Sequence, residues 1–223
     1  GAQMTALGLV FNVLSDGVVS QNQGVMIGAG VVLVYTLFGG MWSVAFTTFV
    51  QMIVIVLGLF YIAYLVAGMS GGVVAVVSHA MDSGRLQFWP KLELADMLMF
   101  IAAWVTMGFG SIPQQDVFQR VNSSKNENVG AYGSIRGGSA YLLFAFVPLC
   151  LAYAATLIDP KMVAGLIDGD SQLILPTLIF NHLPLYAQVI FFGALLSVIM
   201  STASGTLLAP SVTISENILK GLF

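Results

Sequence analysis

The stretch that decides the fold is "GALLSVIMSTASGTLLAPSVTISENI", residues 193 to 218. It overlaps an apolar run from Leu185 to Leu208 that is interrupted only by small and hydroxyl-bearing side chains. A helix that crosses a bilayer needs about 20 predominantly apolar residues, and this run is long enough. The segment therefore predicts a transmembrane helix that carries hydroxyl groups into the membrane.

The composition of the whole chain agrees with this prediction. Of 223 residues, 58% are hydrophobic and 8% are charged, and the mean hydropathy of +0.94 is far from that of a soluble domain. The apolar runs are long, continuous and rich in glycine, unlike the short alternating segments of a strand barrel. We expect an all-α membrane protein with about six spans, at 1–14, 23–39, 43–67, 97–118, 138–156 and 186–208. Because the chain opens inside an apolar run, we interpret 1–223 as the central part of one transmembrane domain.

The distribution of charge predicts how these spans are oriented, since basic residues favour connections on the cytoplasmic side. The connection 119–136 holds three basic residues and one acidic residue, namely Arg120, Lys125, Arg136 and Glu127. The connections 68–96 and 157–183 carry more acidic than basic residues. We therefore expect 119–136 and Lys220 inside, and the two acidic connections outside. The net charge of −3 and the scattered basic residues give no reason to expect nucleic acid as a partner.

One predicted span breaks the rules of a regular helix. Residues 97–120 read "MLMFIAAWVTMGFGSIPQQDVFQR", in which Pro113 lacks the N–H that would bond the carbonyl of Phe109. Two glycines and a serine just before the proline weaken the helix further. The segment is either a helix with a proline kink or a discontinuous helix that lines a substrate cavity.

The hydroxyl groups of 193–218 also have two readings. Small residues recur at every fourth position, so they can simply let another helix approach closely, and a Ser or Thr hydroxyl can bond the carbonyl four residues earlier. These small residues are Gly193, Ser197, Ser201 and Gly205. Alternatively, Ser201 and Thr202 converge on one ion if the carbonyl of Val198 completes the shell. Neutral oxygens suit a hard monovalent cation such as Na⁺.

Three motifs resemble the sodium:solute symporter family, which includes Na⁺/proline, Na⁺/galactose and sialic acid transporters and the high-affinity choline transporter. They are "YTLFGGMWSVAFTTFVQ" (35–51), "GSIPQQDVFQRVNSSKNENVGAYG" (110–133) and the opening stretch. The resemblance implies a leucine-transporter-type inverted repeat of five plus five helices that works by alternating access. It also implies that 186–208 is the eighth core helix, whereas the first two and last two core helices have no counterpart here.

The resemblance assigns roles to several residues of the hydroxyl-rich helix. It implies a Na⁺ site whose second half is Ser201, Thr202 and the Val198 carbonyl, and an ion exit path past Thr48 and Ser204. Family members usually carry Asp where this chain has Thr48, and some have a serine where this chain has Gly205. Because both oxygens differ here, we expect one coupled Na⁺ rather than two.

The resemblance also points to a substrate site in the interrupted span. The aromatic residues that surround the solute in the proline and choline branches align with Met107, Ser111 and Gln114, so neither aromatic box is present. The site predicted instead is polar and uncharged. It comprises Met107, Phe109, Ser111, Gln114 and Gln115. Such a lining suits a small neutral or zwitterionic solute, amino-acid-like or choline- and betaine-like.

Together these features predict a Na⁺-driven symporter of a small organic solute, with several passes through a cell membrane, such as the bacterial inner membrane. The chain arranges no nucleophile with a base and an oxyanion donor, so an enzyme is not expected. Its single cysteine, Cys150, excludes a disulfide within the chain. One alternative is the symporter-like sensor domain of a membrane histidine kinase. Another is a channel, which explains the interrupted span less well.

Overall fold

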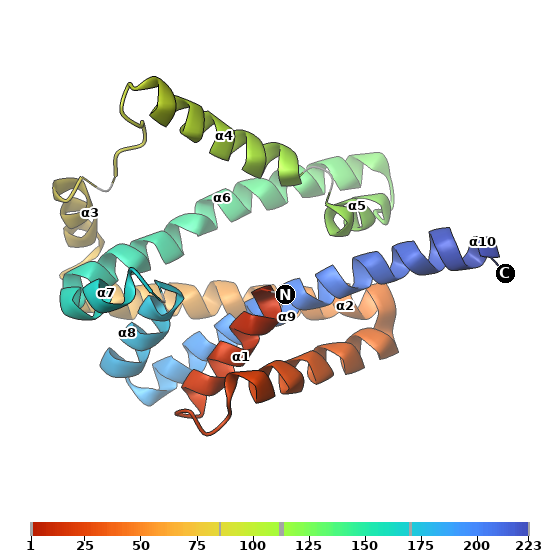
Figure 1. Ribbon diagram of the computed structural model, residues 1–223, viewed down its shortest axis with the longest axis horizontal. Helices are drawn as coiled ribbons and strands as arrows, with labels where there is room; N and C mark the ends of the chain where they lie inside the picture. The colour runs from red at the N-terminus through yellow and green to blue at the C-terminus, as the bar shows by residue number, and fades with distance from the viewer. Residues whose placement is uncertain (1, 85, 112–113, 170, 223) are drawn as a thin grey trace.

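The structure is a computed structural model that describes residues 2–84, 86–111, 114–169 and 171–222, apart from the side chains at positions 2, 35, 38–41, 111, 115, 116 and 222. These ranges contain helices and no strand, so the prediction of an all-α protein is confirmed (Figure 1). The α-helices are α1 (Ala2–Leu14), α2 (Gln21–Met69), α3 (Val73–Asp82), α4 (Leu94–Ser111), α5 (Gln115–Asn122), α6 (Glu127–Ile158), α7 (Pro160–Leu166), α8 (Ile174–His182), α9 (Leu185–Thr213) and α10 (Lys220–Leu222). A 3₁₀ helix, Ser171–Leu173, precedes α8, and a π-helix, Ile214–Leu219, follows α9.

Three helical segments are long and apolar enough to cross a membrane. They are Trp42–Met69, Glu127–Ile158 and Leu185–Leu219, which contain the predicted spans 43–67, 138–156 and 186–208. The described parts of the other three predicted spans are apolar helices of 10–17 residues, which is shorter than a bilayer crossing needs. The count of six spans and the inverted-repeat topology therefore stay predictions.

Helix α2 is continuous in its backbone but bent back on itself. Its N-terminus is fixed by a capping box, in which the Ser20 hydroxyl accepts from the Gln23 N–H and the Gln23 side chain accepts from the Ser20 N–H. Figure 1 shows the ribbon turning between an N-terminal arm, residues 21–34, and a C-terminal arm, residues 42–69. The sequence in the turn contains the adjacent glycines Gly39 and Gly40, which weaken a helix. The two predicted spans on either side of these glycines are therefore the two arms of one helix.

The core is the seam where α1, α2 and α9 meet. Apolar side chains from all three helices are buried there, with α6 and α8 closing one end. The largest of these buried side chains are Leu7, Ile62, Leu151, Ile179 and Phe192. This core fixes α9 against the C-terminal arm of α2, and that pairing positions the hydroxyl groups described below.

The connections gather at opposite ends of the long helices (Figure 1). Helices α3, α7 and α8 lie at one end, where His79 Nε2 of α3 is 3.2 Å from Thr156 Oγ1 of α6. Helix α5 and the C-terminal segment lie at the other. The placement of 68–96 and 157–183 outside the membrane and of 119–136 with Lys220 inside stays a prediction.

The predicted basic loop 119–136, however, is wrong in extent. Helix α5 continues to Asn122 and α6 begins at Glu127, so the connection is only residues 123–126. The Asn126 side chain starts α6 by accepting from the Val129 N–H at 2.9 Å, a cap that a charge count does not reveal.

The proline-containing span is discontinuous rather than kinked. Helix α4 ends at Ser111, Gln114 has an extended backbone, and α5 begins at Gln115, while Pro113 lies outside the described residues. Figure 1 shows α4 set apart from the α1–α2–α9 seam. Within the described ranges α4 makes no extended contact with another helix, so nearly all of its side chains are exposed. The interruption is confirmed, and its role in lining a substrate cavity stays a prediction.

We predict that Gly24→Leu destabilises the protein by about 1–3 kcal/mol relative to Gly30→Leu. A Cβ at Gly24 would lie 2.8 Å from Phe11 Cβ and 2.9 Å from the Gly8 carbonyl oxygen, whereas a Cβ at Gly30 meets nothing within 4 Å. Both changes give the same gain in helix propensity, so the difference in stability between the two variants reports the packing of α1 on α2. The apparent Tm of the purified protein checks this, and equal values would contradict the α1–α2 contact.

A carboxylate organises the corner between α6 and α7, outside the predicted spans. Asp159 caps α7 by accepting from the Met162 N–H at 3.0 Å, and His182 Nε2 lies 3.2 Å from its other oxygen. The hydrogen bond from Met162 and then the contact with His182 hold the pKa of Asp159 below its usual range. A depressed pKa adds stability above the ordinary pKa of aspartate, about 3.9, and this stability is lost as the pH falls through the lower folded pKa.

We therefore expect Asp159→Asn, which keeps the cap but removes the charge, to have a lower apparent Tm than the wild type at neutral pH. The two proteins should converge as the pH falls through the lowered pKa of Asp159, because both side chains are then neutral. The measurement is the Tm of both proteins from neutral to acidic pH. A difference that does not shrink on acidification would show that the carboxylate charge is not responsible.

Candidate functional site

The candidate site lies where α9 crosses the C-terminal arm of α2. A Cβ at Gly58 of α2 would lie 3.2 Å from Ala194 Cβ of α9, so the two helices approach closely there. Further along, Ser201 Oγ of α9 donates to Thr48 Oγ1 of α2 at 3.4 Å. Residue numbers fall along α2 as they rise along α9, so the helices are antiparallel. Gly58 of α2 and Ala194 of α9 permit the close approach, whereas a Cβ at Gly193, one of the four small residues of the predicted stripe, would meet nothing within 4 Å.

The hydroxyl groups of α9 use two different kinds of partner. Thr202 Oγ1 donates to the Val198 carbonyl at 3.0 Å, and Ser204 Oγ donates to the Ser201 carbonyl at 2.9 Å. These are bonds back to the preceding turn, which need no ligand. The hydroxyls of Thr206, Ser211 and Thr213 bond in the same way. Ser201 alone of these hydroxyls crosses to α2.

The predicted Na⁺ ligands are thus brought together in part. The Val198 carbonyl and the Thr202 hydroxyl are adjacent, on a side of α9 that is exposed in the described chain. Ser201 is half-buried and its hydroxyl turns toward Thr48. The 3.4 Å distance from Ser201 Oγ to Thr48 Oγ1 is longer than a usual O–H···O bond of 2.5–3.0 Å, so this hydrogen bond is weak. All of these groups are neutral oxygens of the kind Na⁺ accepts, and their convergence on one ion stays a prediction.

A cavity of about 290 Å³ opens beside the Ser201–Thr48 contact. It lies between α2, α5 and α9, and its lining mixes apolar side chains with neutral polar groups and one guanidinium. The lining residues are Val44, Ala45, Thr48, Gln119, Arg120, Ser123, Gly205 and Leu208. Of the two predicted exit-path residues, Thr48 therefore faces the cavity, while the Ser204 side chain is completely buried behind it.

Three cavity residues were not foreseen as part of a site. Gln119 and Arg120 come from α5 and Ser123 is the C-cap residue that follows it, in a segment that the charge count assigned to a loop. Gln119 Nε2 also donates to the Ala209 carbonyl at 3.5 Å, which links α5 to α9. Positions 119 and 123 are four apart and so share one helical face, and this was the signal available in the sequence.

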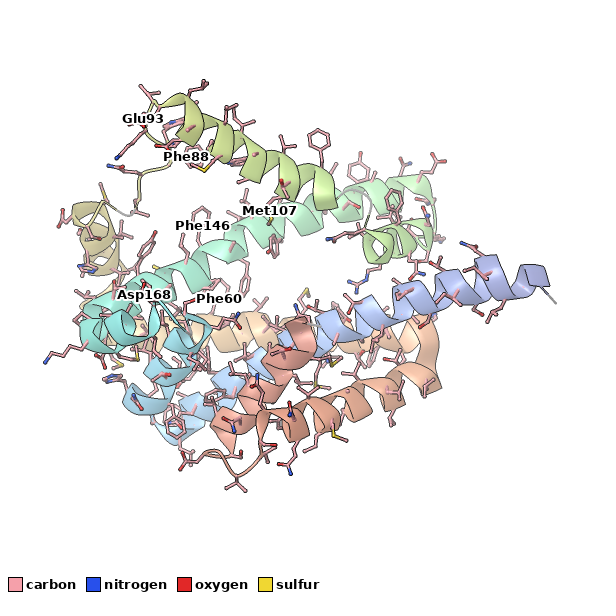
Figure 2. All side chains as sticks on the ribbon, viewed as in Figure 1. Phe60, Phe88, Glu93, Met107, Phe146 and Asp168 are labelled. Atoms are coloured by element: carbon pink, nitrogen blue, oxygen red, sulfur yellow. The ribbon has the colours of Figure 1, made fainter. Side chains whose placement is uncertain are left out.

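The predicted substrate residues do not form an enclosed site within the described chain. Met107, Phe109 and Gln114 are exposed, and the side chains of Ser111 and Gln115 lie outside the described residues. Figure 2 shows Met107 on the edge of α4 nearest α6. Phe109 borders an open apolar depression together with Trp104, Val105 and Gly108. The physical reason is that α4 has no extended contact with another described helix.

The apolar helices, the interrupted helix and the hydroxyl-lined contact define a helical multi-pass membrane protein. Comparison with known families makes the class specific. The chain belongs to the sodium:solute symporter family, because the sequence model of that family matches residues 2–223. The resemblance inferred from the three sequence motifs is therefore confirmed.

Several curated relatives are high-affinity choline transporters. The protein of Torpedo marmorata is 27% identical over 223 residues, which cover 97% of this chain and 38% of the relative. The human protein gives the same values, and that of Rattus norvegicus is 28% identical over 194 residues, covering 84% of this chain and 33% of its own length. The chain thus spans less than two fifths of these relatives. No solved structure matches.

We predict that a cysteine at position 48 reacts with a polar thiol reagent, whereas one at position 204 does not. Thr48 lines the cavity, whereas the Ser204 side chain is fully buried. The two positions are nevertheless close, because Thr48 contacts Ser201, which lies one turn before Ser204 in α9. The variants Thr48→Cys and Ser204→Cys would be made in a Cys150→Ser background and labelled in membranes. Faster labelling of Ser204→Cys would contradict the placement of the cavity.

Proposed function

We propose that this chain is part of a secondary active transporter that couples the entry of Na⁺ to that of a small organic solute by alternating access. The observation that carries the proposal is the contact between Ser201 and Thr48 beside a cavity that Thr48 lines, in a chain that matches the symporter family over residues 2–223. A cluster of neutral oxygens within two apolar helices suits a cation that must bind and leave again.

The proposed Na⁺ ligands are the Val198 carbonyl and the hydroxyls of Ser201 and Thr202. The Ser201 hydroxyl now makes only a long contact with Thr48 at 3.4 Å, so an ion would replace a weak contact there, while the Thr202 hydroxyl would turn from an ordinary bond to the Val198 carbonyl at 3.0 Å. Release would follow the cavity past Thr48, with Ser204 supporting the Ser201 carbonyl from behind.

Coupling then requires that ion and solute favour the same conformation. A ligand shifts an equilibrium only by its difference in affinity for the two states, so Na⁺ must bind one arrangement of α9 and α2 better than the other. The helix proposed to hold the solute is interrupted, because α4 ends at Ser111, Gln114 is extended and α5 begins at Gln115. Interrupted helices at the substrate site are typical of transporters of this kind.

For the solute we propose a small neutral or zwitterionic molecule, amino-acid-like or choline- and betaine-like. Met107, Phe109 and Gln114 offer apolar, aromatic and amide groups without a charge, and the sequence places Ser111 and Gln115 beside them. The named substrate of the curated relatives, choline, belongs in the test panel for that reason. The expected location is a cell membrane, with the bacterial inner membrane as the specific proposal.

The test of transport is uptake by the full-length protein in proteoliposomes, with an inward Na⁺ gradient or K⁺ in its place. The panel should contain amino acids, choline, betaines, sugars and carboxylates. Accumulation of one solute only with Na⁺ would support the proposal. Binding of a solute without any accumulation would contradict it and favour the sensor.

We predict that changing Ser201 and Thr202 together to Ala raises the Na⁺ concentration for half-maximal uptake on the order of tenfold, because two ion-binding oxygens are lost. The matched control is Ser211→Ala with Thr213→Ala, which removes two hydroxyls of α9 that bond only to the preceding turn. Unchanged Na⁺ dependence in the first variant would remove the site assignment.

A further inference from the structure

One buried polar atom in the described chain has no partner where two helices meet. Gln51 lies in the C-terminal arm of α2 and is half-buried, and its Oε1 is shielded from solvent with no hydrogen-bond donor among the described residues. Buried polar side-chain atoms nearly always have a partner, and an orphan in a native protein points to a group that supplies one.

The register of the two helices places Gln51 level with the proposed ion ligands. Thr48 meets Ser201, and ten residues further along α2 Gly58 meets Ala194 and Ile190. Because the helices are antiparallel, a step of three residues from Thr48 to Gln51 corresponds to about three residues back from Ser201. Gln51 therefore lies across from the turn between Val198 and Ser201, on the same face of α2 as Thr48.

We infer that Gln51 is a further Na⁺-binding residue, whose amide oxygen contributes to the ion's shell from α2 while Ser201 and the Val198 carbonyl contribute from α9. This inference rests on the proposed function. It adds a ligand from α2 to the half of the site that α9 supplies. The ion would then respond to any relative movement of α2 and α9.

The chemistry of the neighbouring groups favours a cation over a hydrogen-bond donor from the protein. Thr47 is satisfied within α2, because its hydroxyl donates to the carbonyls of Ser43 and Val44 at 2.8 and 3.1 Å. Thr202 and Ser204 donate within α9. The hydroxyls of Thr47, Thr202 and Ser204 are thus occupied as donors, and an amide oxygen at this level is well matched by a positive ion.

The experiment is a Na⁺ titration of the thermal stability of the full-length protein, with K⁺ keeping the ionic strength constant. A ligand that binds only the folded state raises the Tm by an amount that grows with the logarithm of its concentration relative to Kd, so the titration reports Na⁺ binding without transport. The test variant is Gln51→Met, which keeps the side-chain length and removes the oxygen. The control is Thr36→Val, which removes the other orphan buried oxygen of α2, next to its bend.

We expect Gln51→Met to weaken Na⁺ binding about fivefold or more, the effect of one lost neutral ligand, and Thr36→Val to leave it unchanged. Gln51→Glu should instead bind Na⁺ more tightly, because a carboxylate adds charge to the shell. A wild-type response to Na⁺ that Gln51→Met retains in full would overturn the inference and leave the proposed function intact. A wild type that does not respond to Na⁺ would overturn the proposed function itself.

Discussion

The antiparallel contact between α9 and the C-terminal arm of α2 is the constraint on which the rest of the structure depends. It joins Gly58 to Ala194 in the apolar part and Thr48 to Ser201 in the polar part. Helices α1, α6 and α8 complete the core around this pair. Because polar groups inside a membrane need partners, the contact also determines which oxygens are satisfied and which remain for an ion.

Most hydroxyls of α9 bond to the preceding turn, so hydroxyl content alone is a poor guide to function. The informative groups near the proposed ion are Ser201, whose hydroxyl bonds to α2, and Gln51, whose Oε1 has no partner among the described residues. Ser201 meets Thr48, which lines a cavity that α5 closes with Gln119 and Arg120, and Gln51 lies about one turn further along α2. An ion held between α2 and α9 would couple the positions of these two helices, which is what the proposed alternating access needs.

The sequence predicted the parts of this fold that depend on long apolar runs and on proline, and missed those that depend on local caps and on tertiary packing. The spans around α9 and α6 and the interruption before Gln115 follow from composition and from Pro113. The predicted extent of the loop 119–136 was wrong because the Asn126 cap allows α6 to begin at Glu127. The partner of Ser201 could not be derived from spacing, since it depends on the register of α9 against a helix far away in sequence.

The central claim is that Na⁺ binds between α2 and α9 at the level of Val198 and Ser201. The most direct test is a pair of experimental maps of the full-length protein, one in Na⁺ and one in K⁺, at a resolution that defines side chains. The account predicts an ion in Na⁺ alone, in contact with the Val198 carbonyl, Ser201 and Gln51. Gln51 hydrogen-bonded to protein in both conditions, with no ion between the two helices, would contradict it.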